Sequence, residues 1–414
     1  MKTIIIGGGP AGMMAAITAA QNGDDVILLE RMRSVGRKLS ITGKGRCNVT
    51  NNAPIDEFFQ NIPRNSKFLY SALYQYTNED LIRNLTKLGL KVKVERGQRV
   101  FPVSDNALEV VDKLKKEMDR LGVKVIVNTK VNQILVKDGK VEGVKTDDKK
   151  YSCDKLIIAT GGKSYPLTGS DGNGYRLVQE LGHTIVEPKA SLVPLETYEK
   201  NELQGLSLKN VAITVKDGDK KIYEDFGEML FTHFGLSGPI VLSASSYILR
   251  VKNLEEKLKQ KKITIHIDLK PALSMEKLDS RVQRDFEEHS RKQFKNCLDD
   301  LLPAKMIPYI VKLSHIKEDK QIDQVTKEER TTLVNLLKDL TFTMKDFRPI
   351  EEAIVTAGGV DVKEVNPSTM ESKIVSRLYF AGEILDVDAY TGGFNLQIAF
   401  STGHLAGSVS KDVE

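Results

Sequence analysis

The feature that most constrains this chain is a glycine pattern that directly follows a short apolar strand at its start. Residues 3–6 are Thr-Ile-Ile-Ile, and Gly7, Gly9 and Gly12 then form the pattern G-x-G-x-x-G. An alanine-rich stretch with helical periodicity comes next, and a second apolar run ends at Glu30. A strand, a helix and a second strand in this order predict a doubly wound α/β domain with a parallel sheet.

Each part of this pattern has its own physical role. Gly7 permits a tight turn, Gly9 lets the backbone approach a pyrophosphate, and Gly12 lets helix and strand pack closely. The free amides of the helix N-terminus attract the phosphates. Glu30 lies 18 residues after Gly12, where its carboxylate can accept hydrogen bonds from both ribose hydroxyls and would repel a 2′-phosphate. The pattern predicts a site for FAD or NAD rather than NADP, and a plain βαβ turn is the alternative.

Two later strand-then-glycine elements bear on the choice between these cofactors. A buried strand at 154–159 runs into Thr160 and Gly161, and a strand at 378–380 runs into Gly382 and Glu383. The full fingerprint occurs once, whereas two docked dinucleotide domains would show it twice. The three elements in this order resemble the flavoproteins of the two-dinucleotide-binding type. That resemblance implies an acid beside the flavin ribityl chain, here Glu383.

The segment between these elements is consistent with the same domain. Residues 106–121 have helical periodicity, and residues 123–127 are expected to form a third parallel strand. Two strands at 131–136 and 140–145 flank an Asp-Gly hairpin signal. We therefore expect a three-stranded antiparallel crossover. Val131 stands where this fold usually offers main-chain contacts to adenine.

Three longer blocks are similar to one bacterial family. They read GRKLSITGKGRCNVTN at 36–51, LFTHFGLSGP at 230–239 and AGEILDVDAYTGGFNLQIA at 381–399. Together they resemble the HI0933-like flavoproteins, also called the YhiN or BaiN family, and the resemblance covers the whole chain. It implies FAD, an inserted region and an oxidoreductase activity. Some relatives are described as reducing a conjugated carbon–carbon bond of steroid-like bile acids, and others as reducing uridine in ribosomal RNA to dihydrouridine.

The loop after Glu30 is basic. Residues 31–55 contain no acid, and their cations are Arg31, Arg33, Arg37, Lys38, Lys44 and Arg46. Beside a pyrophosphate site these charges form a local anion trap, and a solvated basic loop is the alternative. Gly43 and Gly45 allow the backbone to approach a flat ring closely. Cys47 and Asn48 follow, and Cys47 is either redox-active or a small residue packed against the flavin.

The last block predicts a loop that enters the final helix. Gly393, Phe394 and Asn395 come at its start, and Phe394 stands where tyrosine is common in the family. A helix N-terminus carries partial positive charge, which at the pyrimidine edge of a flavin would favour the anionic reduced ring. An ordinary capped helix is the alternative. His404, well inside this helix, is expected to be a packing residue.

Residues 191–345 break the α/β rhythm. Strands are expected at 191–195, 211–215, 221–226 and 262–269, whereas residues 274–340 have a mainly helical pattern. We predict a discontinuous FAD-binding domain (1–190 and 346–414), an inserted antiparallel, barrel-like subdomain (191–270) and a helical subdomain (271–345). His233 lies in a glycine-rich turn of the insert. It can donate a proton near neutral pH, or it can simply bond the backbone of the turn.

Composition excludes several classes. Hydrophobic residues are 40% and charged residues 28%, an ordinary globular balance, and the net charge is only +5. No apolar run is long enough for a membrane span or a signal peptide. The three cysteines, Cys47, Cys153 and Cys297, are scattered and show no metal spacing, which favours a reducing, cytoplasmic location and no bound metal.

These patterns lead to one prediction and two alternatives. The first is a cytoplasmic FAD-dependent oxidoreductase that takes electrons from NAD(P)H and reduces an activated C=C bond of an enone-like small molecule. The alternatives are an enzyme that acts on uridine in ribosomal RNA and a non-catalytic flavin-binding protein. His233 and Cys47 are the catalytic candidates. The expected cofactor ligands are Gly7, Gly9, Gly12, Glu30, Arg31, Lys38, Gly43, Gly45, Arg46, Cys47, Asn48, Val131, Thr160, Gly161, Gly382, Glu383, Gly393, Phe394 and Asn395.

Overall fold

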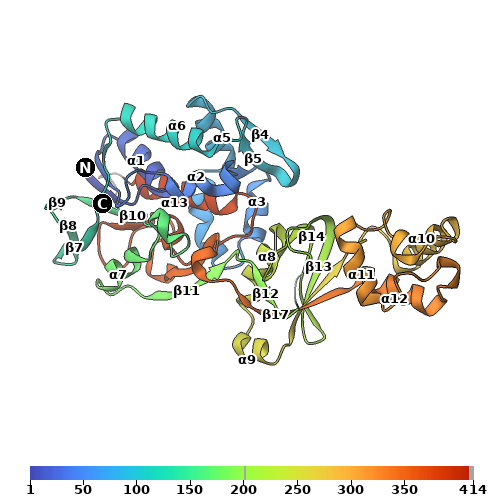
Figure 1. Cartoon of the computed structure of the whole chain (residues 1–414). Helices are drawn as coiled ribbons and strands as arrows, with labels where there is room; N and C mark the ends of the chain where they lie inside the picture. Colours follow the sequence, from blue (N-terminus) through green and yellow to red (C-terminus); the bar gives the residue numbers. More distant parts are fainter. Residues whose placement is uncertain (200–201, 410–414) are drawn as a thin grey trace. The chain divides into compact units, whose positions relative to one another are not determined.

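The structure, a computed structural model, describes residues 1–199 and 202–409. The chain divides into two compact units (Figure 1). Unit 1 comprises Met1–Ser191 and Pro349–Glu414, and unit 2 comprises Leu192–Arg348. Unit 2 is therefore an insertion into unit 1.

A five-stranded parallel sheet forms the centre of unit 1 and confirms the predicted fold class. Its central strand, β1, is apolar along most of its length, as expected for a parallel strand with both faces covered. In sheet order the strands are β19 (Leu378–Phe380), β10 (Lys155–Ile158), β1 (Lys2–Ile6), β2 (Asp25–Leu29) and β6 (Lys124–Ile126).

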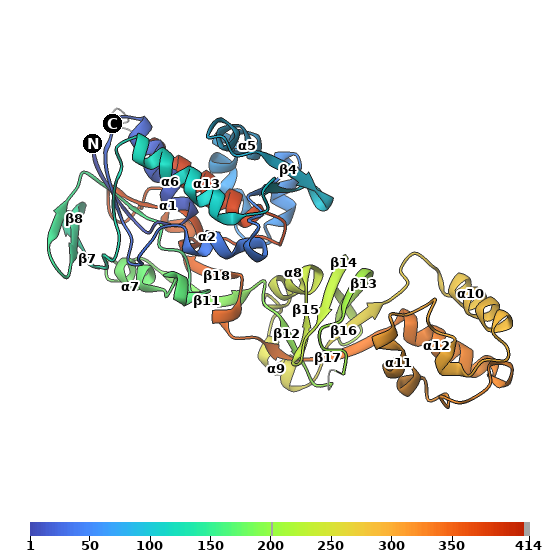
Figure 2. The ribbon, with the colours of Figure 1, turned by 45° about the horizontal axis from the view of Figure 1, so that its top comes forward.

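Three helices pack side by side in unit 1, namely α1 (Pro10–Gln21), α6 (Ala107–Arg120) and α13 (Phe394–Ser408) (Figure 2). Helices α1 and α13 come into close contact through small residues. A Cβ at Gly403 would lie 2.3 Å from the Ala11 carbonyl oxygen, and one at Gly407 would lie 2.7 Å from that of Ala15. The alanine-rich sequence of α1 therefore gives the close contact between the first and last helices of the unit.

The predicted antiparallel crossover is confirmed as β7 (Val131–Lys137), β8 (Lys140–Thr146) and β9 (Lys150–Ser152). Asp138 and Gly139 join the first two strands with φ values of +50° and +73°, as a tight hairpin turn requires. The remaining elements of unit 1 are α2 (Arg37–Ile41), β3 (Thr50–Asn51), α3 (Ile55–Phe58), α4 (Tyr70–Gln75), α5 (Asn78–Lys87), β4 (Val92–Glu95), β5 (Arg99–Pro102), α7 (Asn173–Gln179), β11 (Ile185–Ser191) and β18 (Val355–Val360).

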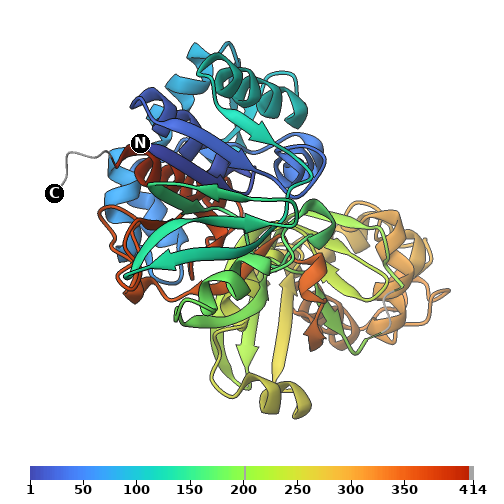
Figure 3. The same ribbon diagram turned by 90° about the vertical axis from the view of Figure 1, so that its left-hand side faces the viewer.

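Unit 2 contains a closed antiparallel barrel, which confirms the barrel-like prediction. In barrel order its strands are β12 (Leu195–Thr197), β15 (Gly235–Ser237), β14 (Lys220–Phe231), β13 (Ser207–Asp217), β16 (Ile263–Asp268) and β17 (Leu340–Phe347). Helices α8 (Pro239–Ile248) and α9 (Leu254–Lys259) belong to the same part of the chain. Between β16 and β17 the chain forms α10 (Met275–Glu288), α11 (Ile307–Ser314) and α12 (Lys327–Lys338), drawn in orange in Figure 3.

Two expected boundaries differ from the structure. The predicted strand at 191–195 is wrong, because β11 ends at Ser191, and Leu192 has a φ of +54°, which breaks an extended strand. In addition, β17 begins at Leu340, so its first residues fall in the range predicted to be helical. Among the described residues no helix is long and apolar enough to cross a membrane.

A buried lysine contacts the C-terminal end of α13. Lys155 is 1% exposed, and its Nζ donates hydrogen bonds to the carbonyl oxygens of Gly407 (3.3 Å) and Val409 (2.8 Å). Burial lowers the pKa of Lys155 from 10.5 to about 8. The cation therefore interacts with helix carbonyls that have no partner within the helix.

This burial predicts a pH dependence of stability. Because the folded-state pKa of Lys155 is below its unfolded value, the unfolded chain binds more protons between about pH 8 and pH 10.5. We expect the contribution of Lys155 to the free energy of unfolding to rise by roughly 3 kcal/mol across this window. Urea unfolding at several pH values would show this rise in the wild type and not in Lys155→Met. An equal rise in both proteins would contradict the assignment to Lys155.

Candidate cofactor site

Four parallel strands of unit 1 end at the same edge of the sheet, and each runs into residues predicted to bind the cofactor. Gly7 follows β1, Glu30 follows β2, Thr160 and Gly161 follow β10, and Gly382 follows β19. Ligands of open α/β sheets bind at this carboxyl edge. The structure therefore brings together residues from four separate parts of the chain.

The glycine turn before α1 leaves space for a ligand. Gly7 has a φ of +104°, and a Cβ there would lie 2.4 Å from the Ala159 carbonyl oxygen. A Cβ at Gly12 would lie 1.9 Å from the Gly7 carbonyl oxygen. At Gly9, by contrast, a Cβ would meet nothing within 4 Å, and no side chain caps the helix. The fold itself requires Gly7 and Gly12, whereas Gly9 borders open space beside the amides of the helix N-terminus.

Glu30 is held in a fixed orientation by the backbone. Its Oε2 accepts a hydrogen bond from the Gly8 amide (2.7 Å), and its Oε1 accepts one from the Met32 amide (2.7 Å). Burial raises the pKa of Glu30, and these two hydrogen bonds oppose the rise. Each carboxylate oxygen can accept a further hydrogen bond, so Glu30 fits the predicted contact with ribose hydroxyls.

The orientation of Glu30 leads to a quantitative prediction. Glu30→Ala should lower FAD affinity by about 1.5–3 kcal/mol, the usual contribution of a hydrogen bond to a charged group. Titration of apo-protein with FAD, followed by flavin fluorescence, would measure the change. Asp25→Ala, at the exposed start of the same strand, is the matched control. Unchanged affinity in Glu30→Ala would show that the ribose lies elsewhere.

Lys38 and Glu383, both predicted cofactor ligands, form an ion pair. The Lys38 Nζ lies 2.7 Å from Glu383 Oε2 and 2.6 Å from Ser164 Oγ. Glu383 Oε1 accepts hydrogen bonds from Ser164 Oγ (3.0 Å) and from the Thr356 amide (2.7 Å). This cluster ties together the loops that follow β2, β10 and β19. A contact between Glu383 and the ribityl chain remains a prediction.

Two arginines of the basic loop are engaged by acids from elsewhere in the chain. Arg31 is paired with Asp171. The Arg46 guanidinium is paired with Glu95 and Asp105 and lies over the Phe101 ring, 4.2 Å from its centroid. The predicted role of Arg46 as a cofactor or substrate ligand stays a prediction, and its charge is already paired with two carboxylates. Fewer positive charges of this loop are therefore available to bind an anion than its own composition indicates.

Cys47 and Asn48, which follow Arg46, both have buried side-chain atoms but differ in their hydrogen bonding. Cys47 is fully buried, and burial raises its pKa to about 12. A thiol is reactive as its thiolate, so the structure does not support a catalytic role for Cys47. The buried Oδ1 of Asn48 has no hydrogen-bond partner among the described residues, and neither has Thr160 Oγ1. Buried polar atoms are nearly always paired, so these two atoms are available for a hydrogen bond with a bound group.

The burial of Cys47 can be tested directly. Cys47→Ala is expected to retain FAD and full turnover, because the thiol is neutral at physiological pH. Steady-state kinetics and the titration of free thiols in the folded protein would check this. A large loss of turnover together with unchanged FAD content would instead support a catalytic role for Cys47.

The turn before α13 is fixed by its own contacts. Gly393 has a φ of +101°, and a Cβ there would lie 2.3 Å from the Thr50 carbonyl oxygen. The Phe394 ring packs edge-on against Phe58 at 4.9 Å. Asn395 Oδ1 accepts a hydrogen bond from the Ala389 amide (2.8 Å), and its Nδ2 donates one to the Ala389 carbonyl (2.7 Å). These residues therefore shape the loop that leads to the helix N-terminus.

The other predicted ligands lie on the same edge or at its turns. Gly43, Gly45, Gly161 and Gly382 all have positive φ, between +56° and +83°. Val131 begins β7, and its carbonyl accepts a hydrogen bond from Asn173 Nδ2 (3.3 Å). His404 lies inside α13 and stacks on Tyr76 at 4.4 Å, which agrees with the packing role expected for it.

A buried carboxylate close to this loop was missed by the sequence analysis. Asp386 is 1% exposed, and its Oδ2 accepts hydrogen bonds from Arg64 Nε (2.8 Å) and Asn65 Nδ2 (3.1 Å). Burial raises its pKa, and its Oδ1 has no partner in the part of the chain that the structure describes. The only sequence signal was the alternation of two acids, Asp386 and Asp388, with apolar residues in the segment 384–389.

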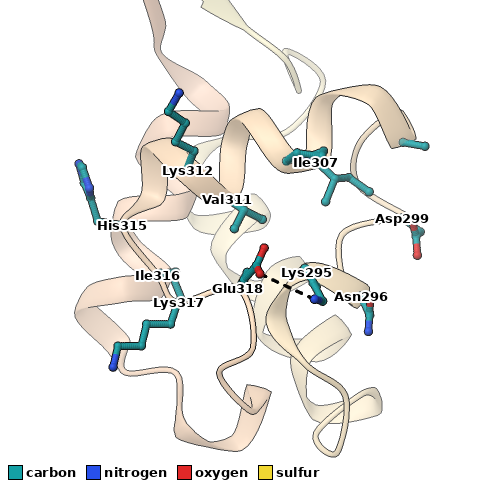
Figure 4. A pocket seen from close by; sticks show the side chains of 12 residues that line it. Lys295, Asn296, Asp299, Ile307, Val311, Lys312, His315, Ile316, Lys317 and Glu318 are labelled. Carbon is teal, nitrogen blue, oxygen red and sulfur yellow. Dashed lines mark ion pairs between the residues drawn. The ribbon is translucent and has the colours of Figure 1, made fainter. Parts of the chain in front are cut away.

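Unit 2 contains a predicted catalytic residue, His233, and a cavity. His233 lies in the turn between β14 and β15, is exposed and packs edge-on against Phe234 at 4.9 Å. A cavity of about 570 Å³ lies between α11 and the segments around Lys295 and Glu318. In Figure 4 the side chains of Lys312 and His315 point away from the centre of this cavity. It contains no predicted site residue, so it is distinct from the cofactor site of unit 1.

Comparison with known proteins then decides the family. Residues 1–409 match the family model described as the HI0933-like protein Rossmann domain. The chain belongs to the HI0933-like family. It is 33% identical over 415 residues to a 3-dehydro-bile acid delta(4,6)-reductase of Clostridium scindens, covering 99% of this chain and 98% of that protein. It is also 33% identical over 411 residues to a ribosomal RNA dihydrouridine synthase of Haemophilus influenzae, covering 97% and 96%.

Solved structures agree with this fold assignment. An E. coli quinol fumarate reductase aligns over 98% of this chain and 69% of its own, with a TM-score of 0.52 and 14% identity. At this identity the likeness concerns the fold alone. The HI0933-like family and its Rossmann-type fold make the chain an FAD-dependent oxidoreductase. The space at Gly9, the Glu30 carboxylate and the unpaired atoms of Asn48 and Thr160 fit this cofactor.

Proposed function

We propose that this HI0933-like protein uses NAD(P)H to reduce a carbon–carbon double bond conjugated to a carbonyl. The observation that supports this proposal is its full-length similarity, at 33% identity, to two enzymes with different printed substrates, a bile acid and ribosomal RNA. A steroid enone and a uracil ring both contain a C=C bond conjugated to C=O. One reaction therefore accounts for both relatives.

The residues of unit 1 bind and orient the cofactor. The amides at the start of α1 and the open space at Gly9 receive the pyrophosphate, and Glu30 receives the ribose. The Lys38–Glu383 pair fixes the loops around the site. The chemistry that bound FAD would supply is hydride transfer from NAD(P)H to the electron-poor carbon of the substrate. Asn48 and Thr160 offer their unpaired side-chain oxygens to the bound group.

Reduction of the double bond also requires a proton at the adjacent carbon. We assign this proton to His233, because its imidazole is exposed on unit 2 and a histidine can donate near neutral pH. His233→Gln should lower turnover about 100-fold or more and leave FAD content unchanged. His315→Gln, at the C-terminal end of α11, is the control. Unchanged turnover in His233→Gln would remove His233 from the mechanism.

The substrate is proposed to be an enone-like small molecule, with uridine in ribosomal RNA as the second candidate. Purified holo-protein with NADH or NADPH would be tested on a steroid enone, while ribosomal RNA from a deletion strain is examined by mass spectrometry. Consumption of NAD(P)H with the enone supports the first candidate. Loss of a two-hydrogen mass increment from the RNA supports the second. If the protein contains FAD and neither of these two results is obtained, the proposed reaction is contradicted.

A cytoplasmic location is part of the same proposal. All three cysteines are free and buried, and this is compatible with a reducing compartment, where NAD(P)H is available. Cell fractionation with an antibody against the native protein would test it.

A further inference from the structure

Three aromatic side chains form a stack on the surface of unit 1. The rings of Phe59 and Tyr70 lie 4.3 Å apart with an interplanar angle of 16°. Tyr74 lies 5.8 Å from Tyr70 and 6.0 Å from Phe59, at angles of 16° and 23°. Tyr70 and Tyr74 are 49% and 48% exposed. Because the three planes are nearly parallel and half of each tyrosine is open to solvent, a further flat ring can add to the stack.

Two cations lie in the sequence between Phe59 and Tyr70. Arg64 is anchored through its Nε to the buried Asp386 carboxylate at 2.8 Å, while its side chain remains 46% exposed. Its two terminal nitrogens have no hydrogen-bond partner among the described residues. Lys67 is exposed, and no ion pair to it occurs in the described part of the chain. The anchored guanidinium therefore presents a fixed pair of donors, the geometry that suits a phosphate.

The stack is connected to the loop beside the cofactor site of unit 1. Asn65 Nδ2 donates a hydrogen bond to the Asp386 carbonyl (2.7 Å), and the Tyr390 amide donates one to the Asn61 carbonyl (2.9 Å). Residues 386–395 lead directly into the N-terminus of α13. A ligand bound at the stack would therefore lie next to the loop that borders the flavin.

We propose that Phe59, Arg64, Lys67, Tyr70 and Tyr74, together called the aromatic surface, bind a single-stranded RNA segment beside the reacting nucleotide. Bases would stack on the two tyrosines, and Arg64 and Lys67 would contact phosphates. A steroid has no phosphate to pair with Arg64 and favours an enclosed apolar pocket over an exposed stack. The inference deepens the second candidate of the proposed function and rests on it, because it requires uridine in RNA to be the substrate.

The first experiment measures how a fluorescein-labelled eight-nucleotide uridine-rich RNA binds to the FAD-loaded, full-length protein, followed by fluorescence anisotropy. Tyr70→Ala and Tyr74→Ala should each weaken binding about ten-fold, the effect of losing one stacked base. Phe226→Ala removes an aromatic ring that is 51% exposed on unit 2 and lies outside the stack. It should leave binding unchanged.

The second experiment tests the cations through the salt dependence of binding. Lys67→Gln should reduce the slope of log Kd against log salt by about 0.7, the value for one phosphate contact with a single strand. Lys67 is preferred to Arg64 for this test, since Arg64→Gln would also leave the buried Asp386 carboxylate with fewer donors. Arg83→Gln, whose side chain is 60% exposed on α5, should leave the slope unchanged.

The outcomes of these experiments test the aromatic surface and the proposed reaction independently of each other. Absence of RNA binding by the wild type, or wild-type affinity in both tyrosine variants, would overturn the aromatic surface. Enone reduction is measured in parallel without RNA. RNA binding that depends on the tyrosines, with no reduction of any enone or uracil ring, would support the surface and contradict the proposed function.

Discussion

Gly9→Val is expected to abolish FAD binding while the apo-protein remains folded. Gly9 has a φ of −78°, which any residue adopts, and a Cβ there meets nothing within 4 Å. The valine methyl groups would instead occupy the space in front of the uncapped amides of α1, where the pyrophosphate is predicted to bind. Flavin absorbance per mole of purified protein measures the loss, and thermal unfolding of the apo-protein measures the fold.

Gly12→Val is the matched control for this experiment. A Cβ at Gly12 would lie 1.9 Å from the Gly7 carbonyl oxygen, so this variant should lower the unfolding temperature of the apo-protein itself. Gly9→Val should leave the unfolding temperature of the apo-protein unchanged. Full FAD occupancy in Gly9→Val would show that the phosphates lie elsewhere.

Removing unit 2 is expected to leave a folded, FAD-binding protein without turnover. The deletion would join Ser191 to Pro349 through a short glycine–serine linker. Ser191 pairs with Val355 in the antiparallel pair β11–β18, so both ends of the deletion are close together within unit 1. The predicted cofactor ligands all belong to unit 1, which has its own hydrophobic core.

Turnover should be lost because the proposed proton donor, His233, belongs to unit 2. The measurements are FAD content, thermal unfolding and NAD(P)H consumption with substrate. His233→Gln in the full-length chain serves as the comparison, since it removes the proton donor alone. Native turnover in the truncated protein would show that unit 2 does not take part in the reaction.

The parts of the fold that could be predicted from the sequence are those with local signals. The strand, glycine turn, helix and second strand occupy the first 30 residues, and each position depends on residues a few places away. The Asp138–Gly139 hairpin is local for the same reason. The barrel was predicted from the alternation in residues 262–269, which recurs as β16 (Ile263–Asp268).

Contacts over long sequence separations could not be predicted in this way. Lys38 and Glu383 are separated by 345 positions, and only the order of strands in the sheet brings them together. The charge of Arg46 was predicted to be available because its own segment contains no acid. Glu95 and Asp105, which follow some 50 to 60 residues later, pair with it in the structure.

The strand expected at 191–195 was wrong for a different reason. Ser191–Leu195 contains three apolar residues that resemble a strand, but the boundary between the two units falls within it. The positive φ of Leu192 turns the chain there. A hydrophobic pattern alone does not predict a backbone turn at a non-glycine residue.

The antiparallel pair β11–β18 has a consequence for how this family can vary. The chain leaves unit 1 directly after one of these strands and returns shortly before the other, so unit 2 forms a cassette with two neighbouring junctions. A cassette of this kind can be exchanged between homologues without changing the register of the parallel sheet. Chimeras that carry the unit 2 of the bile-acid reductase or of the ribosomal RNA synthase on this unit 1 would show whether specificity is inherited with the cassette or with the nucleotide-binding scaffold.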